Sequence, residues 1–187
     1  MPQSAWEPGA GSTIMGYGGS CFPKDTSALA RMGQEFASPV SITETVIAVN
    51  DRVKRRMVEK LKDLSGDSFN GRKIAVLGVT FKPNTDDMRD APSLVIVPAL
   101  VGGGAAVTVV DPEGRRDGEK LLPGGVWEDD ASRAAEDADV VVILSEWPAF
   151  RALDLERIAG AMRTPRRADV RNIYSAEDAR EAGVEAY

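Results

Sequence analysis

The sequence predicts an α/β protein with a long central helix followed by a Rossmann-like parallel sheet domain. Two observations predict this class. Apolar residues recur every three or four positions from Ser41 to Gly66, which is the period of an amphipathic helix. After residue 71, short apolar runs alternate with helical segments, and such alternation implies right-handed crossovers between parallel strands.

The 187 residues are enough for one domain or one and a half, and 43% of them are apolar, as in ordinary globular proteins. We expect three regions. Residues 1–20, rich in Gly, Pro and Ser, form a flexible lead-in to the loop around the single cysteine. Residues 21–68 form a central helical region, in which a short helix over 26–38 ends near Gly33 and Pro39 breaks the chain. Residues 69–187 form the α/β domain.

The long helix begins with a Ser41–Glu44 capping box and ends at Gly66, which makes it roughly 35 Å long. Two interpretations stay open. The helix is either a core helix of one domain, or an element that joins two domains or pairs subunits. Its apolar positions are Ile42, Val46, Val49, Val53, Met57, Leu61 and Leu64.

The sheet region contains four predicted strands, over residues 72–79, 105–112, 139–146 and 166–172. Predicted helices between them cover 91–104, 128–138 and 148–162. Pro98 lies inside the first of these helices, and we expect it to kink the helix or to open its last turns.

The residues that follow each strand indicate a ligand site, because the carboxyl ends of parallel strands meet at one edge of the sheet. Cations at this edge would reach phosphate oxygens, and aromatic rings would stack on a flat base. The alternative is that Lys82 and Arg171 pair with the adjacent acids in NTDDMRD and RADVRN. The residues gathered there are Thr80, Phe81, Lys82, Asp111, Pro112, Glu146, Trp147, Arg171 and Asn172.

This sheet lacks the usual dinucleotide turn. The first strand runs into LGVTFKPNTDD, which has one glycine where GxGxxG requires three. The sequence therefore predicts a nucleotide-binding sheet that is not the NAD site.

Composition excludes several functions. The chain has no histidine and one cysteine, which removes most transition-metal sites and every Cys-His or Ser-His-Asp scheme, so we expect no metal. A net charge of -6 argues against nucleic acid or an anionic membrane surface as a partner. No apolar run approaches the roughly 20 residues of a membrane span, and no signal peptide begins the chain, so we expect a cytoplasmic protein.

Cys21 lies in the stretch GYGGSCFPKD and has two interpretations. An unpaired cysteine is usually a small buried apolar side chain. Against this, the glycine-rich turn leaves room for a substrate, the Lys24 cation favours a thiolate, and Asp25 can act as a base toward water. Spacing alone leaves both open.

Several motifs together resemble one family. GYGGSCFPKD is similar to the catalytic cysteine loop of the UDP-glucose 6-dehydrogenases, within the UDP-glucose and GDP-mannose dehydrogenases. FKPNTDDMRDAPS is similar to their nucleotide-sugar motif. VVDP, LSEWPAF and DVRNIY follow in the family's order, so the resemblance extends from about Gly16 to Tyr187.

The resemblance implies oxidation of the C6 alcohol of UDP-glucose to a carboxylate with two NAD. Cys21 would be the nucleophile, which forms a thiohemiacetal and then a thioester, and Asp25 would help to activate the hydrolytic water. Lys24 and Arg89 would lie near the cofactor. The long helix would link two domains and form a homodimer contact, and residues 69–187 would bind the UDP-sugar. Substrate-contacting positions would be Gly18, Phe81, Lys82 and Arg171.

Departures from the family matter too. The GxGxxG-bearing NAD domain has no counterpart in this sequence, so the chain resembles a carboxyl-terminal part and we expect it not to turn over alone. The segment SAWEPGAGSTIM lacks the arginine that the family usually carries just upstream of the loop. Two alternatives remain: a catalytically silent nucleotide-sugar-binding module, and a GDP-mannose or UDP-amino-sugar dehydrogenase fragment.

Overall fold

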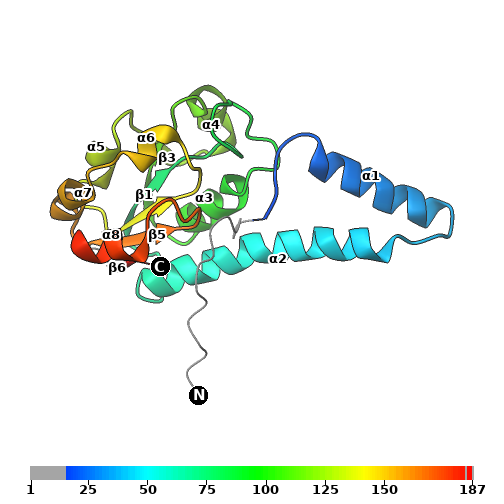
Figure 1. Cartoon of the computed structure of the whole chain (residues 1–187), viewed down its shortest axis with the longest axis horizontal. Helices are drawn as coiled ribbons and strands as arrows, with labels where there is room; N and C mark the ends of the chain where they lie inside the picture. Colours follow the sequence, from blue (N-terminus) through cyan, green and yellow to red (C-terminus); the bar gives the residue numbers. More distant parts are fainter. Residues whose placement is uncertain (1–15, 184, 187) are drawn as a thin grey trace, which may run out of the picture.

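The computed structural model describes residues 16–183, 185 and 186 (Figure 1). Most of the predicted lead-in, residues 1–15, lies outside the described residues. The elements, in chain order, are α1 (Phe22–Glu35), α2 (Ser41–Leu64), β1 (Lys73–Leu77), α3 (Ser93–Gly102), β2 (Ala106–Val110), α4 (Arg115–Leu121), β3 (Gly125–Trp127), α5 (Ala131–Ala135), β4 (Val140–Ile143), α6 (Pro148–Arg151), α7 (Leu155–Ala161), β5 (Arg166–Asp169), α8 (Ala176–Glu181) and β6 (Glu185–Ala186).

The strands form one parallel sheet in the order β3-β2-β1-β4-β5-β6. The predicted α/β class is therefore confirmed. In the centre, Val76 of β1 lies between Val109 of β2 and Val142 of β4. Sequence reasoning missed β3 and β6, because strands of three and two residues are too short to show a period.

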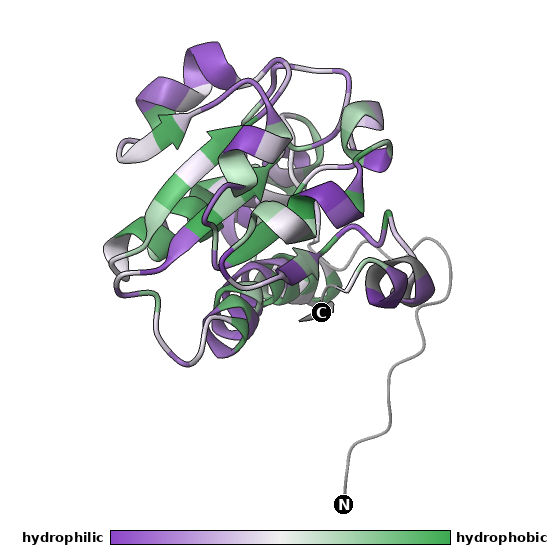
Figure 2. Ribbon diagram, turned by 90° about the vertical axis from the view of Figure 1, so that its left-hand side faces the viewer, coloured by the Kyte–Doolittle hydropathy of each residue, from purple (hydrophilic) through white to green (hydrophobic). Residues whose placement is uncertain are grey.

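Two apolar cores cover the two faces of the sheet, and the central strands are mostly hydrophobic in Figure 2. One core joins the sheet to α2 and α3 through Met57, Leu61 and Ile96. The other joins it to α5, α6 and α7, for example through Phe150 and Ile158. Burial on both faces explains why the strands of this sheet read as continuous apolar runs.

The long helix α2 has two halves with different surroundings. Its second half packs on the sheet domain, where Met57 and Leu61 are buried. Its first half extends away beside α1, and there Ile42 stays 83% exposed (Figure 1). One half of α2 thus belongs to the core, as the first interpretation expects, and the other half leaves it; a role of α2 in joining domains or pairing subunits stays a prediction.

Local predictions around α1 and α2 need correction. The capping box is wrong: Val40 precedes α2, no side chain caps the helix, and Glu44 instead accepts a hydrogen bond from Gln34 of α1. The short helix begins earlier than predicted, at Phe22, because Pro23 fits the first turn. Gly33 is buried inside α1 rather than ending it.

Two helices of the sheet domain also differ from expectation. The helix α3 continues past Pro98 to Gly102, so its last turns do not open. Pro98 is exposed, where water can satisfy the carbonyl that loses its partner. The segment predicted as one helix over 148–162 is α6 and α7, because the Asp154 side chain accepts from the Arg157 N–H and starts a new helix.

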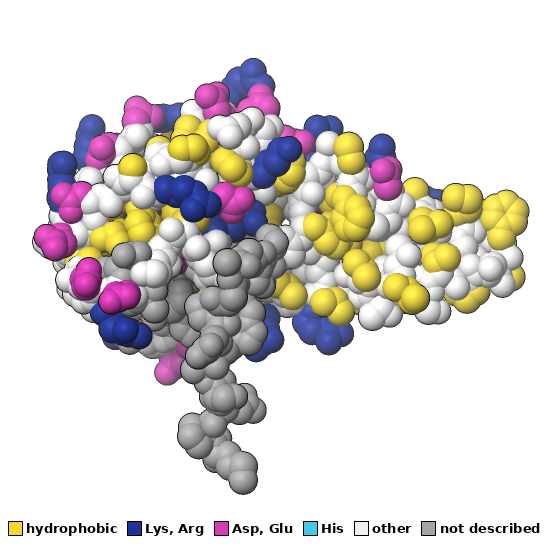
Figure 3. Space-filling model, viewed as in Figure 1, with side chains coloured by type: hydrophobic (Ala, Val, Ile, Leu, Met, Phe, Trp, Pro, Cys, Tyr) yellow, Lys and Arg dark blue, Asp and Glu magenta, His cyan; other side chains and the backbone are white. Residues whose placement is uncertain are grey.

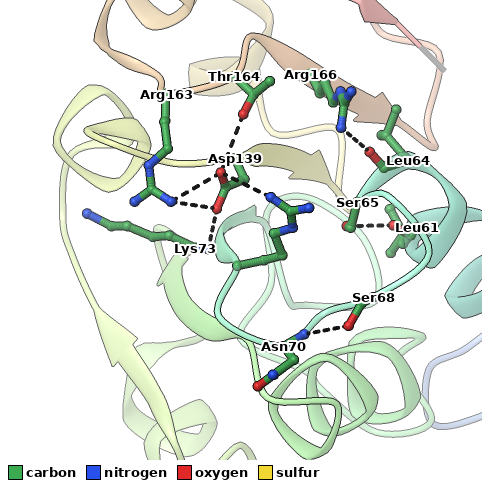
Figure 4. A network of polar contacts seen from close by, with 11 residues as sticks. Leu61, Leu64, Ser65, Ser68, Asn70, Lys73, Asp139, Arg163, Thr164 and Arg166 are labelled. Carbon is green, nitrogen blue, oxygen red and sulfur yellow. Dashed lines mark hydrogen bonds and ion pairs between the residues drawn. The ribbon is translucent and has the colours of Figure 1, made fainter.

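A polar network fixes the amino-terminal edge of the sheet (Figure 4). The buried Asp139 carboxylate accepts from the Lys73 backbone N–H at 2.8 Å and from Arg163 at 3.3 Å. Arg166 of β5 donates to the Leu64 carbonyl at the end of α2, at 3.1 Å. The Asp139 contacts thus join β1 to the segments just before β4 and β5, and the Arg166 contact joins β5 to α2, both at the edge opposite to the predicted ligand site.

Candidate functional site

Two loops that are far apart in the sequence form one surface. We call residues 16–21 the cysteine loop and residues 78–92 the β1–α3 loop. The Gly19 N–H donates to the Arg89 carbonyl at 2.8 Å. Gly19 also lies against the Phe81 ring, since a Cβ built on it would come within 2.8 Å of that ring. A Cβ on Gly18 would lie 2.6 Å from the Asp90 carbonyl oxygen, so only glycine permits this approach.

Cys21 is exposed at the end of this surface, directly before α1. The interpretation of Cys21 as a buried filler is therefore wrong. Its Sγ lies 3.7 Å from the Ser20 Oγ. An exposed thiol on a glycine-rich loop is accessible to a ligand, which a core cysteine is not.

The Arg89 guanidinium lies near this thiol and is held by Asp87. Its Nε and Nη2 each donate to an Asp87 carboxylate oxygen at 2.9 Å. These hydrogen bonds lower the pKa of Asp87 and raise that of Arg89, and negative charge on the nearby Cys21 sulfur would add a smaller rise to the pKa of Arg89. The Arg89 side chain remains 70% exposed, so it can also reach an anion in solution.

Lys24 and Asp25 lie in the first turn of α1. Their side chains form an exposed ion pair at 3.5 Å. Such a pair stabilises a protein by at most about 1 kcal/mol, so both groups can leave it for a ligand. The structure thus places Cys21, Lys24 and Asp25 at one helix end, with Arg89 nearby.

Arg171 is not a free cation. Its side chain is only 7% exposed, and it donates to the Leu144 and Phe81 carbonyls, each at 3.0 Å. Burial lowers the pKa of Arg171, and Glu146 at 3.5 Å offsets part of that effect. Arg171 therefore ties the end of β4 to the backbone at Phe81. The expected pairing with the adjacent acid of RADVRN is wrong: the Arg171 side chain pairs with Glu146, and Asp169 accepts from the Arg171 backbone N–H at 3.2 Å.

Lys82 is the exposed cation of this edge. Its Nζ lies 5.2 Å from the centroid of the Phe81 ring. Within residues 16–183, 185 and 186, no acid forms an ion pair with Lys82, which contradicts the expected pairing. Phe81 is half-buried, so its ring is partly accessible beside the exposed Lys82.

Two other strand-end residues have structural roles. The prediction of Trp147 as a stacking face is wrong, because the ring is buried and its Nε1 donates to Thr80 Oγ1 at 3.2 Å. Asp111 uses both carboxylate oxygens to accept backbone N–H groups, including those of Val79 at 2.6 Å and Gly114 at 2.7 Å. These residues shape the β1–α3 loop and leave little capacity for a ligand.

Sequence reasoning also missed two buried polar residues on α2. Asn50 and Lys54 face the two loops rather than solvent. The signal was present, since both polar residues interrupt the apolar stripe of the helix at a spacing of four.

A depression of about 470 Å³ lies beside the β1–α3 loop, between it and α4. Its lining includes Arg89, Leu94 and Lys120. Among the described residues, no group of three potential ligands could hold a metal ion. No helix of the described chain is long and apolar enough to cross a membrane.

Comparisons with known proteins identify matching families and folds. The model of the UDP binding domain of the UDP-glucose/GDP-mannose dehydrogenase family matches residues 75–176, and that of its central domain matches residues 7–52. The UDP-glucose 6-dehydrogenase of Rhizobium meliloti is 50% identical over 168 residues, which are 90% of this chain and 38% of the relative. That of Bacillus subtilis is 39% identical over 170 residues, 90% of this chain and 37% of the relative.

Solved structures agree. A UDP-glucose dehydrogenase from Pyrobaculum islandicum superimposes with a TM-score of 0.78 at 32% identity, over 92% of this chain and 37% of that one. A UDP-D-ManNAc dehydrogenase from Pyrococcus horikoshii superimposes with a TM-score of 0.73 at 26% identity, over 87% of this chain and 36% of that one. The chain thus spans less than two fifths of the length of each of these four relatives.

Proposed function

Because this chain belongs to the UDP-glucose/GDP-mannose dehydrogenase family, we propose that it is the central and UDP-binding portion of a UDP-glucose 6-dehydrogenase. The whole enzyme would oxidise UDP-glucose to UDP-glucuronate. The observation that carries the proposal is the packing of the cysteine loop on the β1–α3 loop, which joins an exposed thiol to an edge with a ring and a cation. The proposal includes the expected boundary between the central helical region, residues 21–68, and the UDP-sugar-binding domain, residues 69–187.

The UDP-sugar would bind across these two loops. Lys82 supplies the exposed positive charge for a phosphate, and the Phe81 ring supplies apolar surface. Gly18 and Gly19 let the cysteine loop pack closely on the β1–α3 loop, and the sugar would contact the backbone at Gly18. Arg171 would act mainly by holding the Phe81 backbone in place, given its burial.

Cys21 would perform the covalent step. Its sulfur adds to the carbonyl carbon of the sugar C6 aldehyde, and the thiol proton goes to the carbonyl oxygen, which gives a thiohemiacetal. After oxidation to the thioester, water attacks the acyl carbon and the thiolate leaves. Asp25, four residues on in the first turn of α1, would accept the proton of that water.

NAD would accept the hydrides of both oxidations. This chain fits only part of a cofactor site: the side chains of Lys24 and Arg89 are 74% and 70% exposed and can reach phosphate. The sequence carries no GxGxxG turn, so these residues could contribute contacts from one side. We therefore propose that the chain alone does not turn over.

A homodimer is the proposed assembly. We call α1 and the first half of α2 the arm. Apolar side chains remain exposed along it, and they gather on its surface in Figure 3. A contiguous apolar surface of this kind is typical of protein interfaces. The exposed residues are Phe22, Leu29, Met32, Phe36, Ile42, Val46 and Val49. The cytoplasmic location expected from the sequence stays a prediction.

The experiment measures alkylation of Cys21 by iodoacetamide in the presence of UDP-glucose or its C6 aldehyde. The aldehyde can form the thiohemiacetal without any cofactor. We expect it to protect Cys21 more strongly than UDP-glucose does at equal site occupancy, with occupancies set by calorimetric titration. Cys21→Ser serves as the binding control, and propionaldehyde as the control for an untethered aldehyde.

Other outcomes separate the alternatives. Equal protection by both ligands would favour the silent binding module. Tighter calorimetric binding of GDP-mannose or of UDP-N-acetylmannosamine than of UDP-glucose would favour a dehydrogenase for another sugar, which the likeness to a UDP-D-ManNAc dehydrogenase supports. Absence of binding by any sugar nucleotide would refute the proposed site in this chain.

A further inference from the structure

We propose that Asn50 of α2 is a positioning residue that holds Cys21 in its reactive place by clamping the backbone of Tyr17. This inference rests on the proposed function of Cys21. It assigns a role in the site to a residue of α2, a helix outside the ligand edge of the sheet.

The clamp consists of two reciprocal hydrogen bonds. The Tyr17 N–H donates to Asn50 Oδ1 at 2.7 Å, and Asn50 Nδ2 donates to the Tyr17 carbonyl at 3.2 Å. One side-chain amide thus satisfies both polar groups of one backbone residue, as a paired strand would. Asn50 is 7% exposed, so water cannot readily replace these bonds.

The chain around Tyr17 is shaped to fit this clamp. Gly16 has a φ of +77°, and a Cβ built on it would collide with Asn50 Oδ1. A residue with a side chain would therefore be strained at position 16 and would also displace the amide. The close fit indicates that the position of this backbone depends on Asn50.

Tyr17 lies four residues before Cys21 and influences the position of Cys21 through a ring contact. The Tyr17 ring packs edge-on against Phe22, the first residue of α1, with 4.6 Å between ring centroids. Tyr17 therefore holds the chain on both sides of Cys21. Between them, Gly19 is hydrogen-bonded to the Arg89 carbonyl. Loss of the Tyr17 anchor would free the cysteine loop at its amino-terminal end.

Lys54, one helical turn after Asn50, fixes the second loop to the same helix. Its Nζ donates to the Asp90 carbonyl at 3.1 Å, and the side chain is buried. Gly18 packs against that same carbonyl. The helix α2 thus binds the cysteine loop through Asn50 and the β1–α3 loop through Lys54, four residues apart. The position of one loop relative to the other therefore depends on this helix.

The test compares Asn50→Ala with the chain as it stands, in two measurements. Calorimetry gives the affinity for UDP, whose proposed contacts Phe81 and Lys82 do not touch Asn50. Protection of Cys21 by the C6 aldehyde of UDP-glucose gives the strength of adduct formation. We expect UDP affinity to change by less than about twofold and adduct formation to weaken by about tenfold or more, the size expected from losing two buried hydrogen bonds.

Amide hydrogen exchange distinguishes a local positioning role of Asn50 from general support of the fold. We expect faster exchange at Tyr17 and Gly19 with unchanged protection in β1 and β4. Asn50→Asp keeps the acceptor for the Tyr17 N–H and loses the donor, so it should recover part of the adduct strength. Asp51→Ala, at the exposed neighbouring position on the same helix, is the matched control and should alter nothing.

The outcomes are separable. If the unaltered chain forms no adduct, the proposed function fails. If it forms one and Asn50→Ala forms it equally well, the positioning role is wrong. If Asn50→Ala accelerates exchange throughout the sheet, Asn50 supports the fold as a whole and the positioning role is also overturned.

Discussion

Replacement of Arg171 by Met tests whether this residue organises the ligand edge or only supplies charge. Its guanidinium donates to the carbonyls of Leu144 and Phe81 and lies 3.5 Å from Glu146. Methionine has a similar length and no donor. Arg171→Met therefore leaves two partly buried carbonyl groups without their partner.

The magnitude follows from these contacts. A hydrogen bond from a charged donor contributes about 1.5–3 kcal/mol, so the two bonds together contribute about 3–6 kcal/mol. The desolvation of a buried guanidinium and the roughly 2 kcal/mol of side-chain entropy offset about half of that. We expect the free energy of unfolding to fall by about 1.5–3 kcal/mol. For a chain of this size, the Tm should then fall by roughly 3–12 °C.

Lys82→Met is the matched control. Lys82 is exposed, and its contact with the Phe81 ring at 5.2 Å contributes about 0.5–1 kcal/mol at such a site. The Tm of Lys82→Met should fall by only about 1–4 °C, while its UDP affinity should fall about tenfold through the loss of one charged phosphate contact. Arg171→Met should lower both UDP affinity and Tm, because the backbone at Phe81 loses its support.

Thermal unfolding followed by circular dichroism and calorimetric titration with UDP measure the two effects on the same samples. Arg171→Lys keeps the charge and can reach one carbonyl, so its Tm should lie between those of the unaltered chain and Arg171→Met. Equal Tm values for Arg171→Met and Lys82→Met would refute the reasoning, since the contacts of Arg171 with the backbone would then contribute no more to stability than the exposed Lys82 does.

Three further predictions concern the fold, the site and the arm. Asp139→Ala should lower the free energy of unfolding by about 2 kcal/mol in urea, because the Lys73 N–H and Arg163 lose a buried acceptor; a loss below about 0.5 kcal/mol would contradict that role. Arg89 lowers the pKa of Asp87, so the stability from this pair is complete above the ordinary carboxyl pKa of about 3.9 and disappears as pH falls through the lower folded value. Asp87→Asn should therefore flatten the dependence of Tm on pH below about 4, and an unchanged profile would show that the pair does not contribute. Ile42→Asp should shift sedimentation toward the monomer, and a mass independent of this substitution would exclude the first half of α2 from the dimer contact.

The sequence alone predicted the features that depend on local periodicity and on contiguous motifs. The α/β class, the extent of α2 and the four longer strands follow from apolar spacing, because each segment must bury one face or both. The two motifs around Cys21 and Phe81 are contiguous, so they could be found without any knowledge of their spatial relation. Short strands such as β3 were not predicted, because three residues are too few to show a hydrophobic period.

Only the tertiary structure decided how the strand-end residues divide their roles. Lys82 and Arg171 are both cations after strands, yet one is exposed and the other is buried among carbonyl groups of distant segments. Trp147 follows a strand and has an aromatic ring that could stack on a ligand, but the ring lies in the core. The Asn50 clamp joins residues 33 positions apart. Such contacts depend on how helices and loops pack against one another, and that information is distributed over the whole chain rather than contained in any one segment.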